Sequence, residues 1–270
     1  MKKFIFLGGD ERMLYTAAKL GQKYHCTFNG SDIYDYAVLP PQKSPDGISI
    51  PGSDTGYMAL GTLLKTGAVV FTGNVCDELE QVCRNYGFTV INYLEREELA
   101  IENAVLTAEG ALEIALRCLP VSIYGTTAVI TGYGRIAKIL AGYIHSLGGE
   151  VIIACRKKSD RKWAEIRGFK TADITDIAAF SKACSASQLI FNTVPAPVFT
   201  DIAADSIKEK TLYIELASTN GIDLEKACER HIETVIARGL PGKTSPVTAG
   251  QLIAKAIENI LAERGDNLET

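Results

Sequence analysis

Residues 126–137, TTAVITGYGRIA, carry the pattern that decides the fold of half of the chain. A β-branched run ends in Gly132-x-Gly134-x-x-Ala137 and leads directly into an amphipathic helix. This is the fingerprint of a dinucleotide-binding βαβ unit, in which the first glycine permits a tight turn and the second lets the backbone approach a pyrophosphate. A second strand follows at 150–155, at about the expected distance of 20 residues. The alternative is that the glycines only make a turn. We expect a Rossmann domain whose cofactor contacts include Gly132, Tyr133, Gly134, Arg135 and Ile136.

Bulk properties limit the classes of function. A chain of 270 residues suggests two domains, each with its own core. The 28 basic and 32 acidic residues are spread along the chain, which predicts no nucleic-acid partner. The N-terminal apolar run stops after about five residues, whereas a signal peptide needs roughly 7–15. The run is therefore expected to be a strand of a cytoplasmic protein without a membrane segment. Seven scattered cysteines without a CxxC pair predict reduced thiols and no metal site.

The first half of the chain alternates strands and helices, which predicts a parallel sheet covered by helices. We expect strands at 3–8, 24–29, 36–40, 68–72 and 88–94, and helices at 11–21, 57–66 and 77–86. The stretch 40–56, PPQKSPDGISIPGSDTG, is predicted to be a long loop at the carboxyl end of a strand. That edge is where open α/β sheets bind ligands, although a plain surface excursion is equally compatible with the composition.

The second half continues the alternation and predicts a doubly wound sheet. Residues 95–118 are expected to form a helical connection, and 233–242 a last strand that ends in a turn at Pro241-Gly242. A helix at 248–265 follows. The fold class is thus α/β with two doubly wound parallel-sheet domains. The expected boundaries are 1–118 for a substrate or catalytic domain, 119–244 for the NADP-binding Rossmann domain, and 245–270 for a helix that returns to the first domain.

The end of the second Rossmann strand favours NADP over NAD. NAD-binding proteins commonly place an acidic residue there for the ribose hydroxyls, but this chain has Cys155 followed by Arg156, Lys157 and Lys158. We expect Arg156 to bind the 2′-phosphate, because its planar fork suits a phosphate. Lys157 and Lys158 are also compatible with a solvated turn, and NAD itself is not excluded.

Polar and small residues end the next two strands of this domain. The run Asn192, Thr193, Val194 and Pro195 is expected beside the nicotinamide half, with Asn192 and Thr193 contacting its ribose or carboxamide. A proline-terminated strand with its cap is the structural alternative. Ala217 and Ser218 end the following strand in the same row, so they are added as cofactor candidates.

The three histidines argue against simple carbonyl reduction. His25, His145 and His231 fall at strand starts or on an outer helix stretch, where none is well placed for proton transfer. A hydroxyacid dehydrogenase of the usual kind needs a histidine near the carbonyl carbon. Oxidation of a ring or C–N bond is therefore the better interpretation.

Six segments together resemble the family of the dipicolinate synthase A subunit: FLGGDER (6–12), ERE..AI.N...TAEG (95–110), TGYGRIA (131–137), FNTVPA (191–196), ELAS (215–218) and GLPGKTSPVTAG (239–250). They lie in order along nearly the whole chain. The resemblance implies NADP-dependent oxidation of a dihydrodipicolinate-type ring, reached from hydroxy-tetrahydrodipicolinate, to pyridine-2,6-dicarboxylate in spore formation. It also implies a partner, the B subunit of dipicolinate synthase.

A substrate with two carboxylates, as the resemblance implies, calls for arginine, hydroxyl and N–H partners. Arg12 is the first candidate for binding and for the catalytic site. The hydroxyl candidates are Ser53, Thr55, Thr107 and Thr248. Glu109 is the candidate general base, with a cap or an interdomain ion pair as its structural alternative.

Two other functions fit the same residues. One is an independent NADP-dependent dehydrogenase of shikimate or hydroxyacid type, and the other is a nucleotide-sensing module without catalysis. The apolar first domain and the terminal helix leave a homodimer open.

Overall fold

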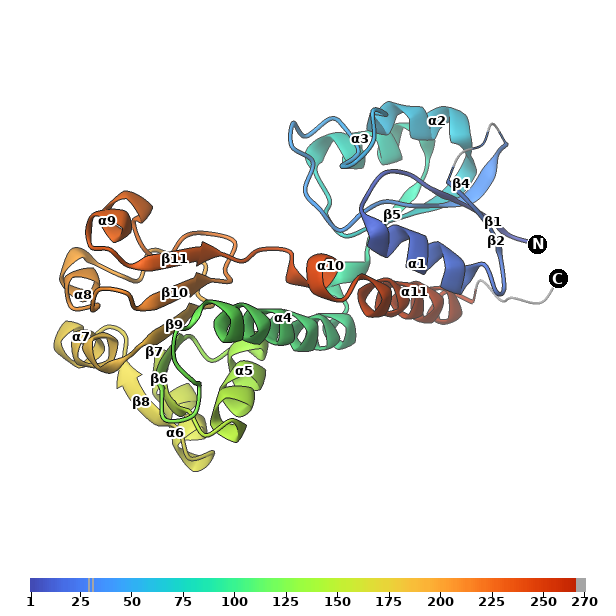
Figure 1. The fold of residues 1–270 in the computed structure, drawn as a ribbon. Coiled ribbons are helices and arrows are strands. Elements are labelled where there is room, and N and C mark those ends of the chain that lie inside the picture. Colours follow the sequence, from blue (N-terminus) through green and yellow to red (C-terminus); the bar gives the residue numbers. More distant parts are fainter. Residues whose placement is uncertain (29, 31, 266–270) are drawn as a thin grey trace. The chain divides into compact units, whose positions relative to one another are not determined.

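A computed structural model describes residues 1–28, 30 and 32–265. The chain divides into two compact units (Figure 1). Unit 1 comprises Met1–Asn103 and Pro241–Thr270, and unit 2 comprises Ala104–Leu240. The divisions thus fall near 103 and 240, whereas the sequence suggested 118 and 244. Asn29, at the end of the strand expected at 24–29, and residues 266–270 of the expected C-terminal segment lie outside the described residues.

Within the described residues, unit 1 contains a five-stranded parallel sheet of order β2-β1-β3-β4-β5. One face packs against helices α1 and α11, and the other against α2 and α3 (Figure 1). The strands are β1 (Lys3–Phe6), β2 (His25–Thr27), β3 (Tyr34–Val38), β4 (Leu64–Thr72) and β5 (Thr89–Asn92). The helices are α1 (Glu11–Leu20), α2 (Leu60–Leu63), α3 (Asp77–Tyr86), α10 (Leu240–Thr244) and α11 (Pro246–Glu263), with 3₁₀ turns η1 (Tyr57–Ala59) and η2 (Tyr93–Glu95).

Two local predictions in unit 1 are wrong. The helix expected at 57–66 is only η1 followed by the four-residue α2, because the chain from Leu64 pairs with β3 as the start of β4. Strand pairing here overrides local helix propensity. The turn expected at Pro241-Gly242 is instead part of the short helix α10.

Helix α11 lies directly against α1, although more than 200 residues separate them in sequence. The buried hydroxyl of Thr16 donates to the carbonyl of Gly250 at 3.0 Å. A Cβ at Gly250 would lie 2.5 Å from the carbonyl oxygen of Arg12 and 3.1 Å from the backbone nitrogen of Thr16. Only glycine therefore allows this approach of the two helices.

Gly250→Ala is expected to destabilise unit 1 by about 2 kcal/mol, because the added methyl group meets rigid backbone atoms of α1. Urea unfolding followed by circular dichroism measures the effect. Gly142→Ala is the matched control, since Gly142 is inside helix α5 and a Cβ there would meet no heavy atom within 4 Å. The control should stabilise its helix by about 0.5–1 kcal/mol. An unchanged urea midpoint for Gly250→Ala would contradict the close packing.

Within its described residues, unit 2 contains a six-stranded parallel sheet of order β11-β10-β9-β6-β7-β8. Counted in chain order this is 3-2-1-4-5-6, the doubly wound order, and it reverses between β6 and β9. The strands are β6 (Thr127–Thr131), β7 (Glu150–Cys155), β8 (Lys170–Asp173), β9 (Leu189–Asn192), β10 (Leu212–Glu215) and β11 (Glu233–Ile236). The prediction of two parallel-sheet α/β domains is confirmed.

Helices cover both faces of this sheet (Figure 1). Residues of α4 (Glu97–Cys118), α5 (Arg135–Ser146) and α6 (Lys158–Ile166) form the core on one face. Residues of α7 (Ile177–Ala186), α8 (Asp201–Asp205) and α9 (Leu224–Glu229) form it on the other. The carboxyl ends of β6 and β9 remain at the edge where doubly wound sheets bind ligands.

Candidate functional site

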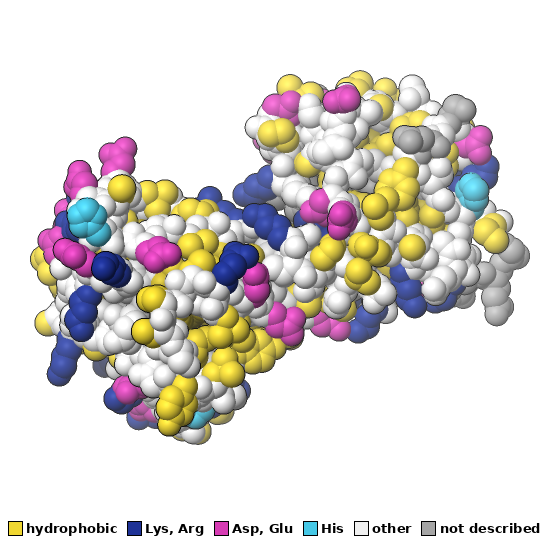
Figure 2. Space-filling view, viewed as in Figure 1, with side chains coloured by type: hydrophobic (Ala, Val, Ile, Leu, Met, Phe, Trp, Pro, Cys, Tyr) yellow, Lys and Arg dark blue, Asp and Glu magenta, His cyan; other side chains and the backbone are white. Residues whose placement is uncertain are grey.

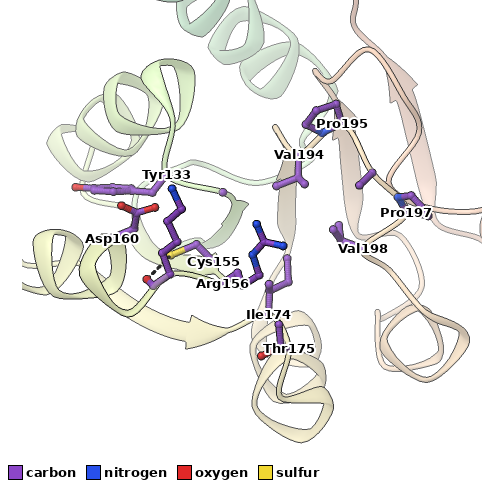
Figure 3. A pocket seen from close by; sticks show the side chains of 13 residues that line it. Tyr133, Cys155, Arg156, Asp160, Ile174, Thr175, Val194, Pro195, Pro197 and Val198 are labelled. Carbon is purple, nitrogen blue, oxygen red and sulfur yellow. Dashed lines mark hydrogen bonds between the residues drawn. The ribbon is translucent and has the colours of Figure 1, made fainter.

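A pocket of about 560 Å³ lies at the carboxyl edge of the unit 2 sheet (Figure 3). Loops that follow β6, β7, β8 and β9 form its wall. Of the predicted cofactor residues, five line it: Gly132, Tyr133, Arg156, Val194 and Pro195. Eight further residues line the pocket but were not predicted from the sequence: Cys155, Lys157, Asp160, Ile174, Thr175, Ala196, Pro197 and Val198. Ile174 and Thr175 directly follow β8, so the position of that strand end was the signal that could have found them.

The geometry of the fingerprint fits a pyrophosphate. Gly132 has a φ of +80°, and a Cβ there would lie 2.9 Å from the hydroxyl of Thr193 and 3.0 Å from Val194 Cγ2. Gly134 caps the N-terminus of α5, and a Cβ there would meet no heavy atom within 4 Å. The second glycine thus leaves open space at a helix N-terminus, where backbone N–H groups and the helix dipole favour an anion. Arg135 and Ile136 occupy the first turn of the same helix.

The loop after β7 carries the cations expected there. Arg156 and Lys157 are exposed and line the pocket, and Arg156 extends toward Ile174 and Val194 (Figure 3). Arg161 holds this loop in place, because its guanidinium donates to the carbonyls of Cys155 at 2.7 Å and Arg156 at 3.0 Å. The carboxylate of Asp160 lines the same pocket. The wall therefore offers two cations and one anion to a ligand.

Cys155 is buried at the end of β7, and burial raises the pKa of its thiol to about 11. The thiol is therefore neutral near pH 7. A neutral side chain thus occupies the place where an acidic residue would repel a 2′-phosphate.

Asn192 departs from its expected role as a ribose or carboxamide contact. It is completely buried, and its amide nitrogen donates to the carbonyl of Val194 at 3.0 Å and to Glu215 at 2.7 Å. Its amide oxygen accepts from the hydroxyl of Thr131 and from the N–H of Val194. Every polar group of this side chain is used inside the protein. Asn192 therefore shapes the wall of the pocket through Val194 instead of facing a ligand.

The other candidates near this edge are placed as follows. Thr193 donates its hydroxyl hydrogen to the carbonyl of Thr131 at 2.6 Å, so only its lone pairs are left for a ligand. Ala217 is buried and Ser218 is exposed, and both follow β10. None of these three lines the pocket.

Glu215, which the sequence reading did not assign to a site, is completely buried at the end of β10. It accepts hydrogen bonds from the hydroxyl of Tyr213 at 2.8 Å and from the N–H groups of Ala217 at 3.0 Å and Gly221 at 2.7 Å, besides the one from Asn192. Burial and the neighbouring Glu215 raise the pKa of Tyr213, so the phenol stays a donor. An acidic residue inside an otherwise apolar strand, TLYIELAS, was the signal that could have found it.

In unit 1, the strand order reverses between β1 and β3, and polar residues follow both strands there. Asp10, the N-cap of α1, accepts from Arg12 Nη2 at 2.7 Å and from Gln42 Nε2 at 2.6 Å. Partial burial raises the pKa of Asp10, but the hydrogen bonds and charge of Arg12 outweigh it and hold the pKa below its ordinary value. Arg12 is largely buried, with 11% of its side chain exposed. Its Nε and Nη2 face Asp10, so Nη1 is the group left for an external carboxylate.

Two of the motif segments meet at this pair. A Cβ at Gly242, in the GLPG segment, would lie 2.7 Å from Arg12 Nε and 2.9 Å from Asp10 Oδ2. Glycine thus lets α10 pack directly on the Asp10–Arg12 pair. This contact gives the FLGGDER and GLPGKTSPVTAG segments a shared structural role.

The loop at 40–56 is folded tightly against the segment after β1. The N–H of Gly9 donates to the carbonyl of Pro51 at 2.7 Å, and a Cβ at Gly52 would lie 2.7 Å from the nitrogen of Gly9. Ser53 and Thr55 form the turn that follows, in which the hydroxyl of Ser53 accepts from the N–H of Thr55 at 3.1 Å. Both side chains are half-buried. Pro51 and Gly52 therefore anchor the loop to the segment that leads into α1, the helix of Arg12, and Ser53 and Thr55 follow this anchor in the chain.

The remaining candidates divide between the units. Thr248 is exposed in the first turn of α11, in unit 1. Thr107 is half-buried and Glu109 is exposed, and both belong to α4 in unit 2. The structure thus groups Arg12, Ser53 and Thr55 in one unit and Glu109 with the pocket-lining residues in the other.

The described residues were also compared with the patterns of metal sites and of membrane-spanning helices. They contain no group of three or more His, Cys, Asp or Glu side chains that could hold a metal ion. None of the helices formed by described residues is long and apolar enough to cross a membrane. Figure 2 shows acidic and basic side chains interspersed over the visible face.

Comparison with known proteins identifies a full-length relative. No family model matches the chain. The dipicolinate synthase A subunit of Bacillus subtilis (strain 168) is 26% identical over 291 aligned positions, which cover 97% of this chain and 96% of that protein. The resemblance expected from the six segments is thereby confirmed.

Solved structures share the fold. The dipicolinate synthase A subunit from Bacillus halodurans superposes with a TM-score of 0.86 at 24% identity, covering 97% of this chain and 98% of that one. A transhydrogenase from Sinorhizobium meliloti gives a TM-score of 0.68 at 13% identity, covering 99% and 94%. The fold of this chain is therefore that of Rossmann-type dehydrogenases.

Proposed function

We propose that this chain, which over its whole length resembles the A subunit of dipicolinate synthase, is an NADP-dependent oxidoreductase that converts a dihydrodipicolinate-type ring into pyridine-2,6-dicarboxylate. The ring would be reached from hydroxy-tetrahydrodipicolinate, in the cytoplasm of a spore-forming cell. The observation that carries the cofactor assignment is the pocket of unit 2, which is lined by Gly132 and by the exposed Arg156, together with the open helix N-terminus at Gly134.

The residues of the pocket have distinct tasks in this proposal. The N–H groups at the start of α5 would bind the pyrophosphate, and Arg156 would bind the 2′-phosphate through its guanidinium fork. Bound NADP⁺ supplies the hydride acceptor. Val194 and Pro195 would limit the space beside the nicotinamide and so orient its ring. Thr193, Ala217 and Ser218 border this edge and would contribute backbone or hydroxyl groups.

Unit 1 would bind the substrate. Arg12 Nη1 and the hydroxyl groups of Ser53 and Thr55 offer donors to the two carboxylates, with Thr248 as a further hydroxyl candidate of this unit and Thr107 as one from unit 2. The oxidation removes one hydride and one proton from the ring, and Glu109 would accept the proton. Because the product ring is aromatic, the protein mainly has to orient the reactants.

The test follows NADPH absorbance with NADP⁺ and enzymatically generated substrate, with and without the B subunit of dipicolinate synthase, the proposed partner. NADPH formation that depends on this chain supports the proposal. Cofactor binding without turnover in either preparation would contradict it and favour a nucleotide-sensing module. Light scattering of the same samples would show whether the chain forms a homodimer.

A further inference from the structure

The last residues of three neighbouring strands form a buried polar row. Thr131 ends β6, Asn192 ends β9 and Glu215 ends β10, and the strand register pairs Thr131 with Asn192 and Asn192 with Glu215. All three are 0% exposed. We call Thr131, Asn192 and Glu215 the polar row. It crosses the sheet at the β6–β9 reversal, directly below the edge that carries the pocket.

The members of the polar row bind one another and the backbone that follows β9 and β10. Thr131 donates to Asn192, and Asn192 donates to Glu215. The hydroxyl of Thr131 accepts from the N–H of Thr193 at 3.2 Å, and Asn192 bonds both backbone groups of Val194. Three strand ends and the turns after two of them, β9 and β10, are therefore connected in one network.

Glu215 organises the far end of this network. Its two carboxylate oxygens accept four hydrogen bonds, two of them from N–H groups of the turn at 217–221. Burying a carboxylate is unfavourable unless such donors compensate for the lost water, and apolar side chains could fill the same space. Stability of the core alone therefore gives no reason for a carboxylate here, whereas fixing two turns at the edge does.

One of the turns that the polar row fixes, at 192–195, belongs to one half of the cofactor site. Val194 lines the pocket and lies next to Gly132 of the fingerprint. In a doubly wound sheet the pyrophosphate crosses the reversal, with adenosine on the β7 side and nicotinamide on the β9 side. The exposed Arg156 after β7 is on the adenosine side. The polar row is thus on the nicotinamide side.

We propose that Glu215 is a positioning residue, which acts through Asn192 to hold the turn at 192–195 in the shape that binds the nicotinamide half of the dinucleotide. This inference rests on the dinucleotide binding of the proposed function. It assigns no contact between Glu215 and the ligand.

Calorimetry with two ligands tests the proposal: NADPH, and adenosine 2′,5′-bisphosphate, which lacks the nicotinamide half. Glu215→Gln places an N–H donor where the carboxylate accepts, and we expect the Kd for NADPH to rise about tenfold. The Kd for the bisphosphate should stay within about twofold, because the adenosine side is intact. Ser187→Ala is the control, since Ser187 is also 0% exposed but lies before β9, at the opposite edge. It should leave both Kd values unchanged.

A second pair of variants tests the same positioning role if Glu215→Gln folds poorly. Thr131→Val keeps the side-chain shape and removes the hydroxyl, so it should weaken NADPH binding selectively, whereas Thr131→Ser should retain it. Equal weakening of both ligands, or unchanged NADPH affinity in Glu215→Gln and Thr131→Val, would overturn the positioning role. A wild-type chain that binds neither ligand would overturn the proposed function itself, which separates the two failures.

Discussion

Arg156→Glu is expected to raise the Kd for NADP about 100-fold and to leave the Kd for NAD within about threefold. The variant removes a charge-assisted contact to the 2′-phosphate and puts a carboxylate in its place. NAD carries an uncharged hydroxyl at that position. The substitution therefore removes no ion pair from NAD and adds no repulsion between like charges. Calorimetry with both nucleotides measures the difference.

Lys158→Glu is the matched control, because Lys158 is exposed two residues further along and does not line the pocket. It changes the net charge equally and should alter neither Kd by more than about threefold. Equal losses for both nucleotides in Arg156→Glu would contradict the 2′-phosphate assignment. A wild-type preference for NAD would contradict it too, and Asp160 in the same pocket would then be the acceptor for the ribose hydroxyls.

Arg12→Ala is expected to weaken binding of pyridine-2,6-dicarboxylate about 30-fold while NADP binding stays within about twofold. The variant removes the guanidinium and leaves the carboxylate of Asp10 without its ion pair. That unpaired carboxylate would then repel the dicarboxylate. The cofactor pocket lies in unit 2 and shares no residue with this pair. Calorimetry with the dicarboxylate and with NADP separates the two effects.

Lys19→Ala supplies the control, since Lys19 is exposed in the last turn of the same helix. Arg12→Lys keeps the charge without the planar fork and should bind with intermediate affinity. Dicarboxylate affinity that is unchanged in Arg12→Ala would show that Arg12 serves only to hold Asp10 and α10 in place.

Local patterns predicted the parts of the fold that local physics controls. The fingerprint at 126–137 is followed by the expected strand and helix, since its glycines and apolar spacing act within one βαβ unit. Residues 57–66 were predicted wrongly, because pairing of Leu64 with a distant strand ended the helix. Helix α10 was not predicted for a similar reason. Its Gly242 packs on Arg12, which is far away in the sequence, so the local pattern does not show why a glycine stands there.

The pattern of polar residues at strand ends predicted which segments line the pocket but not which way each side chain points. Arg156 follows a strand and lines the pocket. Asn192 also follows the pattern of a ligand contact, yet its partners are Thr131 and Glu215 on neighbouring strands. Which strands are neighbours is a property of the sheet order. A linear sequence therefore does not distinguish a buried amide that shapes a wall from one that touches a ligand.

Unit 1 is assembled from both ends of the chain, and this sets an order for folding during synthesis. Unit 2 is contiguous from Ala104 to Leu240, so its folding needs no residue of the two segments that build unit 1. Unit 1 has to wait for α11, whose side chains Ile253, Ile257 and Leu261 complete its core. Until then the apolar face of α1 stays exposed to water. The first hundred residues of the nascent chain therefore depend on the last thirty for protection from aggregation.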